Sequence, residues 1–250
     1  HHPPGHQAFL PEGRILASRT TYDLFQTAGQ EELQWYTDNS AKQLEVSRQR
    51  LAEAKDDKER TQAEMWIGYY QGLVEALPGL RLCPPAATFE GRLALHGKER
   101  AAELITFAKA HTGSDTVLYL PGEKIVFLGD LLFVGCHPYL ADGDPAGLLA
   151  ALQEIESWGA GRLVPGHGPV GTPEDLRLMI AYLQECQETA RELVEAGPGW
   201  EGRFKQVKPG DRFAGWKLAR FHEANLRFLC QHLSAAADAT TSQEGCHEPA

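Results

Sequence analysis

The sequence lacks several features that would point to a membrane, secreted or nucleic-acid-binding protein. It has no apolar run near the roughly 20 residues that a membrane-spanning helix needs, so we expect no membrane partner. Its five cysteines are an odd number without paired short spacing, which fits neither a disulfide framework nor a CxxC zinc site and favours a reducing, cytoplasmic location. The net charge is -10 and the cationic residues are dispersed, so a nucleic-acid partner is disfavoured.

Length and composition are typical of one globular domain. The 250 residues, 42% of them hydrophobic, can bury one substantial core. We expect a domain over residues 1–234 and a disordered tail over residues 235–250, because the tail is small, polar and poor in bulky apolar side chains. The first residue is His1 rather than methionine, which leaves open a signal peptide that has been removed.

The order of predicted elements indicates an α/β protein. Residues 31–77 have a helical pattern interrupted by a charged run, which predicts a helical hairpin whose aromatic stripe packs into the core. Predicted strands follow at residues 80–83, 88–95, 102–107, 116–120, 124–128 and 162–164. Predicted helices cover residues 145–158, 173–196 and 215–233.

Three short segments place metal-capable side chains directly after apolar strands. They are His111-Thr-Gly-Ser-Asp115, Leu128-Gly-Asp130 and Pro165-Gly-His-Gly168. Glycine beside each candidate lets the backbone turn sharply, so that the side chains can converge at the end of a sheet. Imidazole nitrogen suits zinc, and a carboxylate can reach two metals through its two oxygens. Each segment alone is also typical of an ordinary turn, so the prediction rests on all three together.

Taken together, these segments resemble the metallo-β-lactamase superfamily. The stretch AHTGSDTVLYLPGEKIVFLGDLLF is similar to the family's third-histidine strand pair, which ends at its metal-bridging aspartate, and LVPGHGPV is similar to its last metal-histidine motif. The resemblance implies that His111 ligates the first zinc ion, Asp130 bridges two zinc ions and His167 ligates the second. It also implies an αββα sandwich, with residues 31–77 as a helical insertion.

The amino terminus departs from the family motif HxHxDH. In a gapless alignment, His2 takes the last histidine of the motif and His1 stands at the aspartate position. A second alignment sets His1 and His6 at the two ends of the motif and needs a deletion afterwards. We prefer the gapless alignment because it also aligns the following Phe-Leu-Pro segment and strand. It adds His1 and His2 to the candidate zinc ligands and implies that the strands before the motif are missing from this chain.

The loop of residues 135–144 follows Asp130 directly, so we expect it beside the metals. His137 and Tyr139 are therefore candidate substrate-binding residues, placed to contact substrate or a developing oxyanion. An equally good alternative is that His137 only shapes the loop and that Asp144 caps the following helix.

The resemblance implies hydrolysis of an ester, thioester, lactone or related acyl bond in a small molecule. Metal-bound hydroxide would attack the carbonyl, and Asp130 would be the catalytic carboxylate that positions the metals. An aspartate at this position is similar to thioesterase-like and lactonase-like branches, so β-lactam hydrolysis is not favoured. The alternative is a catalytically silent binding protein with a degraded metal site, whose stability would not change on chelation.

Overall fold

The computed structural model describes residues 7–10, 13–197 and 199–244. The chain divides into two compact units, His1–Phe89 and Glu90–Ala250. The single domain predicted over residues 1–234, with residues 31–77 as a helical insertion, stays a prediction. Among the residues that the structure describes, no helix is long and apolar enough to cross a membrane.

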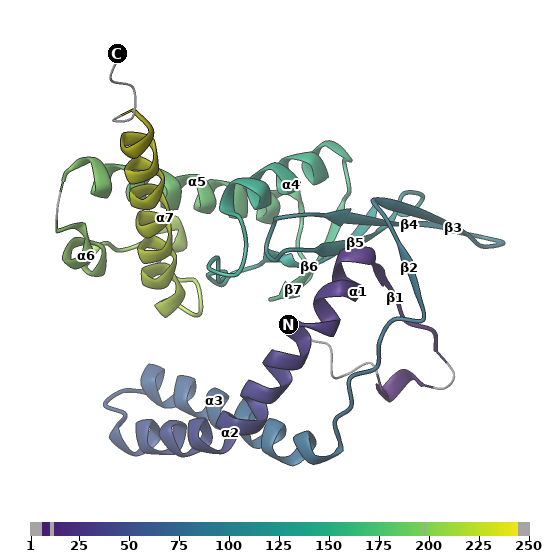
Figure 1. The fold of residues 1–250 in the computed structure, drawn as a ribbon, viewed down its shortest axis with the longest axis horizontal. Helices are drawn as coiled ribbons and strands as arrows, with labels where there is room; N and C mark the ends of the chain where they lie inside the picture. The colour runs from purple at the N-terminus through teal and green to yellow at the C-terminus, as the bar shows by residue number, and fades with distance from the viewer. Residues whose placement is uncertain (1–6, 11–12, 198, 245–250) are drawn as a thin grey trace, which may run out of the picture. The chain divides into compact units, whose positions relative to one another are not determined.

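The first unit consists of helices that are connected to a small parallel sheet (Figure 1). Strand β1 (Leu16–Ser18) pairs with β2 (Ala87–Phe89). Between them the chain forms α1 (Arg19–Gln26), α2 (Ala28–Glu53), α3 (Asp57–Ala76) and the short 3-10 helix η2 (Leu77–Gly79). Helices α2 and α3 pack side by side, which confirms the helical hairpin predicted from the sequence.

The contact between α2 and α3 differs from the prediction in its side chains. The predicted aromatic stripe is only partly buried, and Tyr69 is 45% exposed. The buried positions of the two helices are instead mostly small, namely Ser40, Leu44, Ser47 and Ala63. Small side chains let two helix backbones approach closely, so the larger rings lie at the edge of the contact.

The second unit is built on a five-stranded sheet in the order β3-β4-β5-β6-β7. The strands are β3 (Arg92–His96), β4 (Ala101–Phe107), β5 (Asp115–Leu120), β6 (Ile125–Phe133) and β7 (Arg162–His167). Pairing is antiparallel from β3 to β6 and parallel between β6 and β7. A parallel neighbour needs a crossover connection, which α4 (Pro145–Ser157) supplies.

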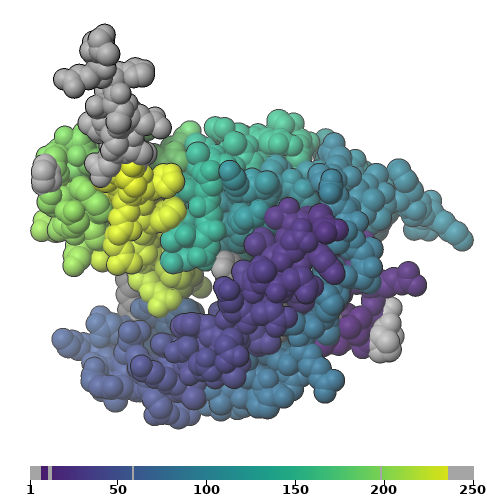
Figure 2. Space-filling model, viewed as in Figure 1, coloured from purple at the N-terminus to yellow at the C-terminus, as the bar shows by residue number. Residues whose placement is uncertain are grey.

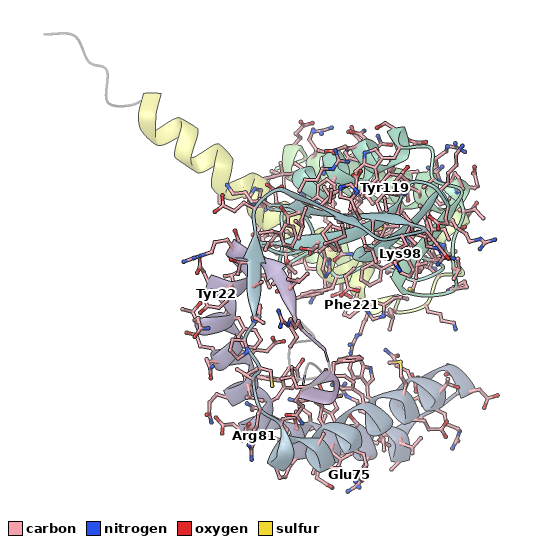
Figure 3. The ribbon with its side chains drawn as sticks, turned by 90° about the vertical axis from the view of Figure 1, so that its right-hand side faces the viewer. Tyr22, Glu75, Arg81, Lys98, Tyr119 and Phe221 are labelled. Atoms are coloured by element: carbon pink, nitrogen blue, oxygen red, sulfur yellow. The ribbon has the colours of Figure 1, made fainter. Side chains whose placement is uncertain are left out.

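The hydrophobic core lies between one face of this sheet and the helices. Alternate residues of the strands, such as Val117, Val126 and Leu163, are buried with α4 and with α5 (Pro173–Glu195). Tyr119, labelled in Figure 3, stacks on Trp158 just after α4, with ring centroids 5.2 Å apart. The α/β fold class is confirmed.

The carboxyl-terminal part adds a second layer of helices. After α5 come α6 (Trp200–Arg203), the 3-10 helices η3 (Phe204–Gln206) and η4 (Asp211–Phe213), and α7 (Arg220–Glu244). Helix α7 packs against α5 and η3, and Figure 2 shows its yellow surface beside the green segment around residue 200. The helix continues past residue 234, where the sequence predicted a disordered tail to begin; residues 245–250 lie outside the described residues.

Two strand predictions are wrong. Residues 80–83 form no strand, and the single strand predicted over residues 88–95 is divided between β2 and β3. The division falls at Gly91, whose φ of 61° is the left-handed conformation that glycine adopts without strain. An apolar pattern that continues through a glycine does not show that the backbone changes direction there.

Candidate metal centre

Asp130 lies inside β6, which continues past residue 128, where the sequence predicted the strand to end. The pairing of β6 is irregular on both sides of Gly129. In the parallel pairing of β6 with β7, Gly129 lies opposite Pro165 and Phe133 lies opposite His167. Four steps along β6 therefore correspond to two steps along β7. The alternation of side chains is broken at this irregularity, so the carboxylate of Asp130 is turned toward the end of β7.

Close approach of β7 to this bulge depends on Gly166. A Cβ atom built on Gly166 would clash with Oδ1 of Asp130 and would lie 2.9 Å from its backbone nitrogen. Any larger residue would therefore have to displace the carboxylate or the strand. The first glycine of the motif Pro-Gly-His-Gly therefore leaves room for Asp130. The sequence had indicated only that glycine allows a turn there.

His111 lies in the connection between β4 and β5 and is held there by its neighbours. Asp115 accepts hydrogen bonds from the backbone nitrogen and the hydroxyl of Thr112, at 2.9 Å and 3.0 Å. Asp144 donates its backbone N–H to the carbonyl of Ala110 at 2.9 Å. The His111 side chain is 4% exposed. The hydrogen bonds of Asp115 and Asp144 fix the backbone on both sides of His111, so its buried imidazole has little freedom to reorient.

A loop residue that the sequence reasoning missed also contributes to this placement. A Cβ atom on Gly143 would clash with the carbonyl oxygens of Ala110 and His111. The loop before α4 can therefore lie directly against the backbone of the candidate ligand only because residue 143 has no side chain. In the sequence, the only sign of this role was that Gly143 directly precedes Asp144, the cap of the next helix.

The three candidate side chains of the second unit meet around Asp130. Oδ2 of Asp130 lies 3.9 Å from Nε2 of His111, and Oδ1 lies 3.5 Å from Nε2 of His167. The carboxylate therefore faces two imidazoles with different oxygens. Asp130 is 16% exposed and His167 is 45% exposed, so the cluster is open to solvent on the His167 side.

Each histidine–aspartate pair of this cluster can be compared with two ligands of one zinc ion. Two donors on one tetrahedral zinc ion lie about 3.4 Å apart, given zinc–ligand distances of about 2.0–2.2 Å. The separation of 3.5 Å between Asp130 and His167 is close to that value, and the separation of 3.9 Å between Asp130 and His111 is longer. Within the described ranges, however, no group of three or more His, Cys, Asp or Glu side chains is arranged to hold a metal ion. Each histidine–aspartate pair would need further ligands to complete a zinc site.

The predicted ligands His1 and His2 lie outside the described residues. Their role as zinc ligands therefore stays a prediction, as do the metal roles of His111, Asp130 and His167.

The two candidate substrate-binding residues are placed differently from the expectation. His137 is fully buried, and its ring lies 5.2 Å from Tyr182 and 5.6 Å from both Trp216 and His222. Tyr139 is half-buried, 5.4 Å from the ring of Phe221, which is labelled in Figure 3. His137 thus packs among aromatic side chains in the interior, and its role in substrate binding stays a prediction.

Asp144 has the capping role that the loop-shaping alternative predicted. Its carboxylate accepts hydrogen bonds from the backbone nitrogens of Ala146 and Gly147, at 2.9 Å and 3.2 Å. The cap begins α4 and leaves the loop before it closed against the His111 connection.

The interior around His137 is an unusual polar cluster. Neither ring nitrogen of His137 has a hydrogen-bond partner among the residues that the structure describes. Burial lowers the pKa of His137 to about 4, with a smaller contribution from His222, and burial also lowers the pKa of His222. Nδ1 of His222 lies 3.2 Å from the hydroxyl of Tyr182, and Asn225 donates to that hydroxyl at 3.3 Å. Both imidazoles are therefore neutral at pH 7.

Comparison with known proteins identifies the family. The family model described as the metallo-beta-lactamase superfamily matches residues 31–167, which is more than half of the chain. The chain belongs to the metallo-beta-lactamase superfamily. Members of this superfamily are mostly metal-dependent hydrolases. The match includes His111, Asp130 and His167, and it begins in α2 of the first unit.

Solved structures of the superfamily are similar to this chain over part of their length. A metallo-beta-lactamase from Pontibacter korlensis is 28% identical, with 44% of this chain and 54% of that chain covered and a TM-score of 0.39. A metallo-beta-lactamase family protein from Thermus thermophilus is 17% identical, with 66% and 54% covered and a TM-score of 0.49. The chain thus spans about half the length of these proteins. No curated protein matches it.

Proposed function

We propose that the chain is a zinc-dependent hydrolase that cleaves an ester, thioester, lactone or related acyl bond in a small molecule. The observation that carries the proposal is the geometry of Asp130, whose two oxygens face the Nε2 atoms of His111 and His167 at 3.9 Å and 3.5 Å. Superfamily membership supports metal-dependent hydrolysis in general.

In this proposal the chain's own residues hold and orient the reacting groups. His111 and Asp130 would hold one zinc ion, and Asp130 and His167 would hold another, each with further ligands. Zinc bound there would polarise an acyl carbonyl and lower the pKa of a water ligand toward about 7. The buried His111 closes one side of the centre. A substrate would enter from the opposite side, where His167 is more exposed to solvent.

The first test is zinc stoichiometry, measured by elemental mass spectrometry on the purified 250-residue chain and on an Asp130→Asn variant. We expect zinc in the parent chain and less in the variant, which keeps the shape of the side chain but loses its charge. Chromogenic ester, thioester and lactone substrates would then be assayed, and we expect turnover of at least one class by the parent chain only. A parent chain without zinc would contradict the proposal.

The second candidate is a catalytically silent binding protein of the same superfamily. It is favoured by the lack of a three-ligand group in the described part of the chain. Little or no bound zinc, together with no turnover of any acyl class by the parent chain, would favour this candidate over the hydrolase.

A further inference from the structure

The aromatic ring of Phe133 contacts both candidate histidines. It lies 4.8 Å from the ring of His167 at an interplanar angle of 15°, which is a stacked arrangement. It lies 5.7 Å from the ring of His111 at 49°. Phe133 is 4% exposed, so this ring is fixed by the surrounding core rather than free to follow the imidazoles.

Backbone pairing fixes the relation between Phe133 and His167. The two residues lie opposite each other in the parallel ladder of β6 and β7. The next residue, Val134, donates its backbone N–H to the carbonyl of His167 at 2.9 Å. Both Cα positions are therefore set by the sheet, and stacking on Phe133 restricts the orientation of the His167 ring.

Stacking of this kind favours an electron-poor imidazole. The face of a phenyl ring carries partial negative charge, and it attracts a positively polarised group more strongly than a neutral one. An imidazole that donates its lone pair to a metal ion is electron-poor. The Phe133 face therefore stabilises His167 more in the metal-bound state than in the free state. It also reduces the side-chain entropy that a half-exposed histidine would lose on binding.

We propose that Phe133 is a positioning residue that holds His167, and to a lesser degree His111, in the orientation that binds metal. The inference rests on the proposed function, because it assigns these histidines to a metal. It goes beyond it by assigning part of the metal affinity to a residue that has no metal-binding atom.

The test is a titration of the full chain with cobalt(II), followed by visible absorption, which reports both affinity and ligand geometry. We expect Phe133→Leu to weaken binding roughly 10-fold, as removal of a group that orients a metal ligand does, and to change the absorption bands. Phe133→Tyr keeps the aromatic face, so it should bind nearly as the parent chain does. Should Phe133→Leu not fold, Phe133→Met keeps more of the volume and serves the same comparison.

The matched control is Phe213→Leu, which also shortens a fully buried phenylalanine but lies among Tyr182 and Trp216 in the helical layer. It should lower the thermal midpoint and leave cobalt affinity unchanged. Equal affinity and equal spectra for the parent chain and Phe133→Leu would overturn this inference alone. Absence of cobalt binding by the parent chain would overturn the proposed function together with it.

Discussion

Gly166 is the residue whose missing side chain matters most directly to the candidate centre. We expect Gly166→Ala to reduce zinc affinity roughly 10-fold, because the new methyl group would push the Asp130 carboxylate away from the histidines. Overpacking would also cost about 1–3 kcal/mol of stability. Isothermal titration with zinc and a urea denaturation curve measure the two effects.

Gly161→Ala is the control for this change. A Cβ atom at Gly161 would have no atom within 4 Å, and the residue precedes the same strand. Both variants gain one methyl group. If the two had the same zinc affinity, the steric role of Gly166 would be refuted.

Acid should destabilise the chain through His137. An unfolded histidine has a pKa near 6.5, whereas burial holds that of His137 at about 4 in the folded state. Because the unfolded chain then binds the extra proton, the contribution is fully present above about pH 6.5 and is lost as pH falls toward 4. The loss amounts to about 3 kcal/mol across that range.

Urea denaturation at a series of pH values would measure this effect. A His137→Phe variant, which keeps a ring without a titrating nitrogen, should be less sensitive to acid over the same range. His222 remains in that variant, so part of the acid sensitivity should persist. Identical pH profiles for the parent chain and the variant would rule out His137 as the source.

Helix α4 owes its beginning to the Asp144 cap. We expect Asp144→Ala to lower the free energy of unfolding by about 1 kcal/mol, because two backbone N–H groups lose their acceptor. Asp144→Asn should retain most of the stability, since an amide oxygen can also accept. Denaturation midpoints of the three proteins check this, and a loss as large in Asp144→Asn would point to charge rather than capping.

At the scale of whole elements, the sequence predicted the type of structure better than its exact path. Alternating and helical patterns located the hairpin, the strands on either side of Pro121-Gly122, and helices α4 and α5. The bulge in β6 and the break at Gly91 were missed, because both depend on pairing with strands distant in sequence. The aromatic stripe was assigned to the core because hydrophobic spacing does not show which neighbours are small enough for close packing.

The sequence predicted the ligand segments of the candidate centre but not the contacts that depend on strand register. Each of the segments that carry His111, Asp130 and His167 ends or interrupts an apolar strand, so a common sheet edge could be inferred. That Phe133 stacks on His167 follows from the register of β6 with β7, which no local pattern specifies. His137 was assigned to substrate from its distance along the chain to Asp130, whereas the loop turns it into the interior.

For the whole molecule, bound metal should raise thermal stability. A ligand that binds only the folded state stabilises it by mass action, by about 2.7 kcal/mol at a hundredfold excess over the dissociation constant. We expect the melting temperature to fall when a chelator is added to the zinc-loaded chain. His167→Ala should show a smaller chelator effect, and an unchanged melting temperature in the parent chain would favour the silent binding protein.

The pairing of β1 with β2 brings together the two ends of the helical segment between them, which allows the length of that segment to vary. Residues 19–86 leave this sheet at Ser18 and return to it at Ala87, so both ends of the intervening helices are tied to one short ladder. The entropic cost of closing a loop grows only slowly with its length. Helical turns can therefore be gained, lost or exchanged between these two points while the ladder keeps its register, which makes the hairpin a natural place to graft segments of different length.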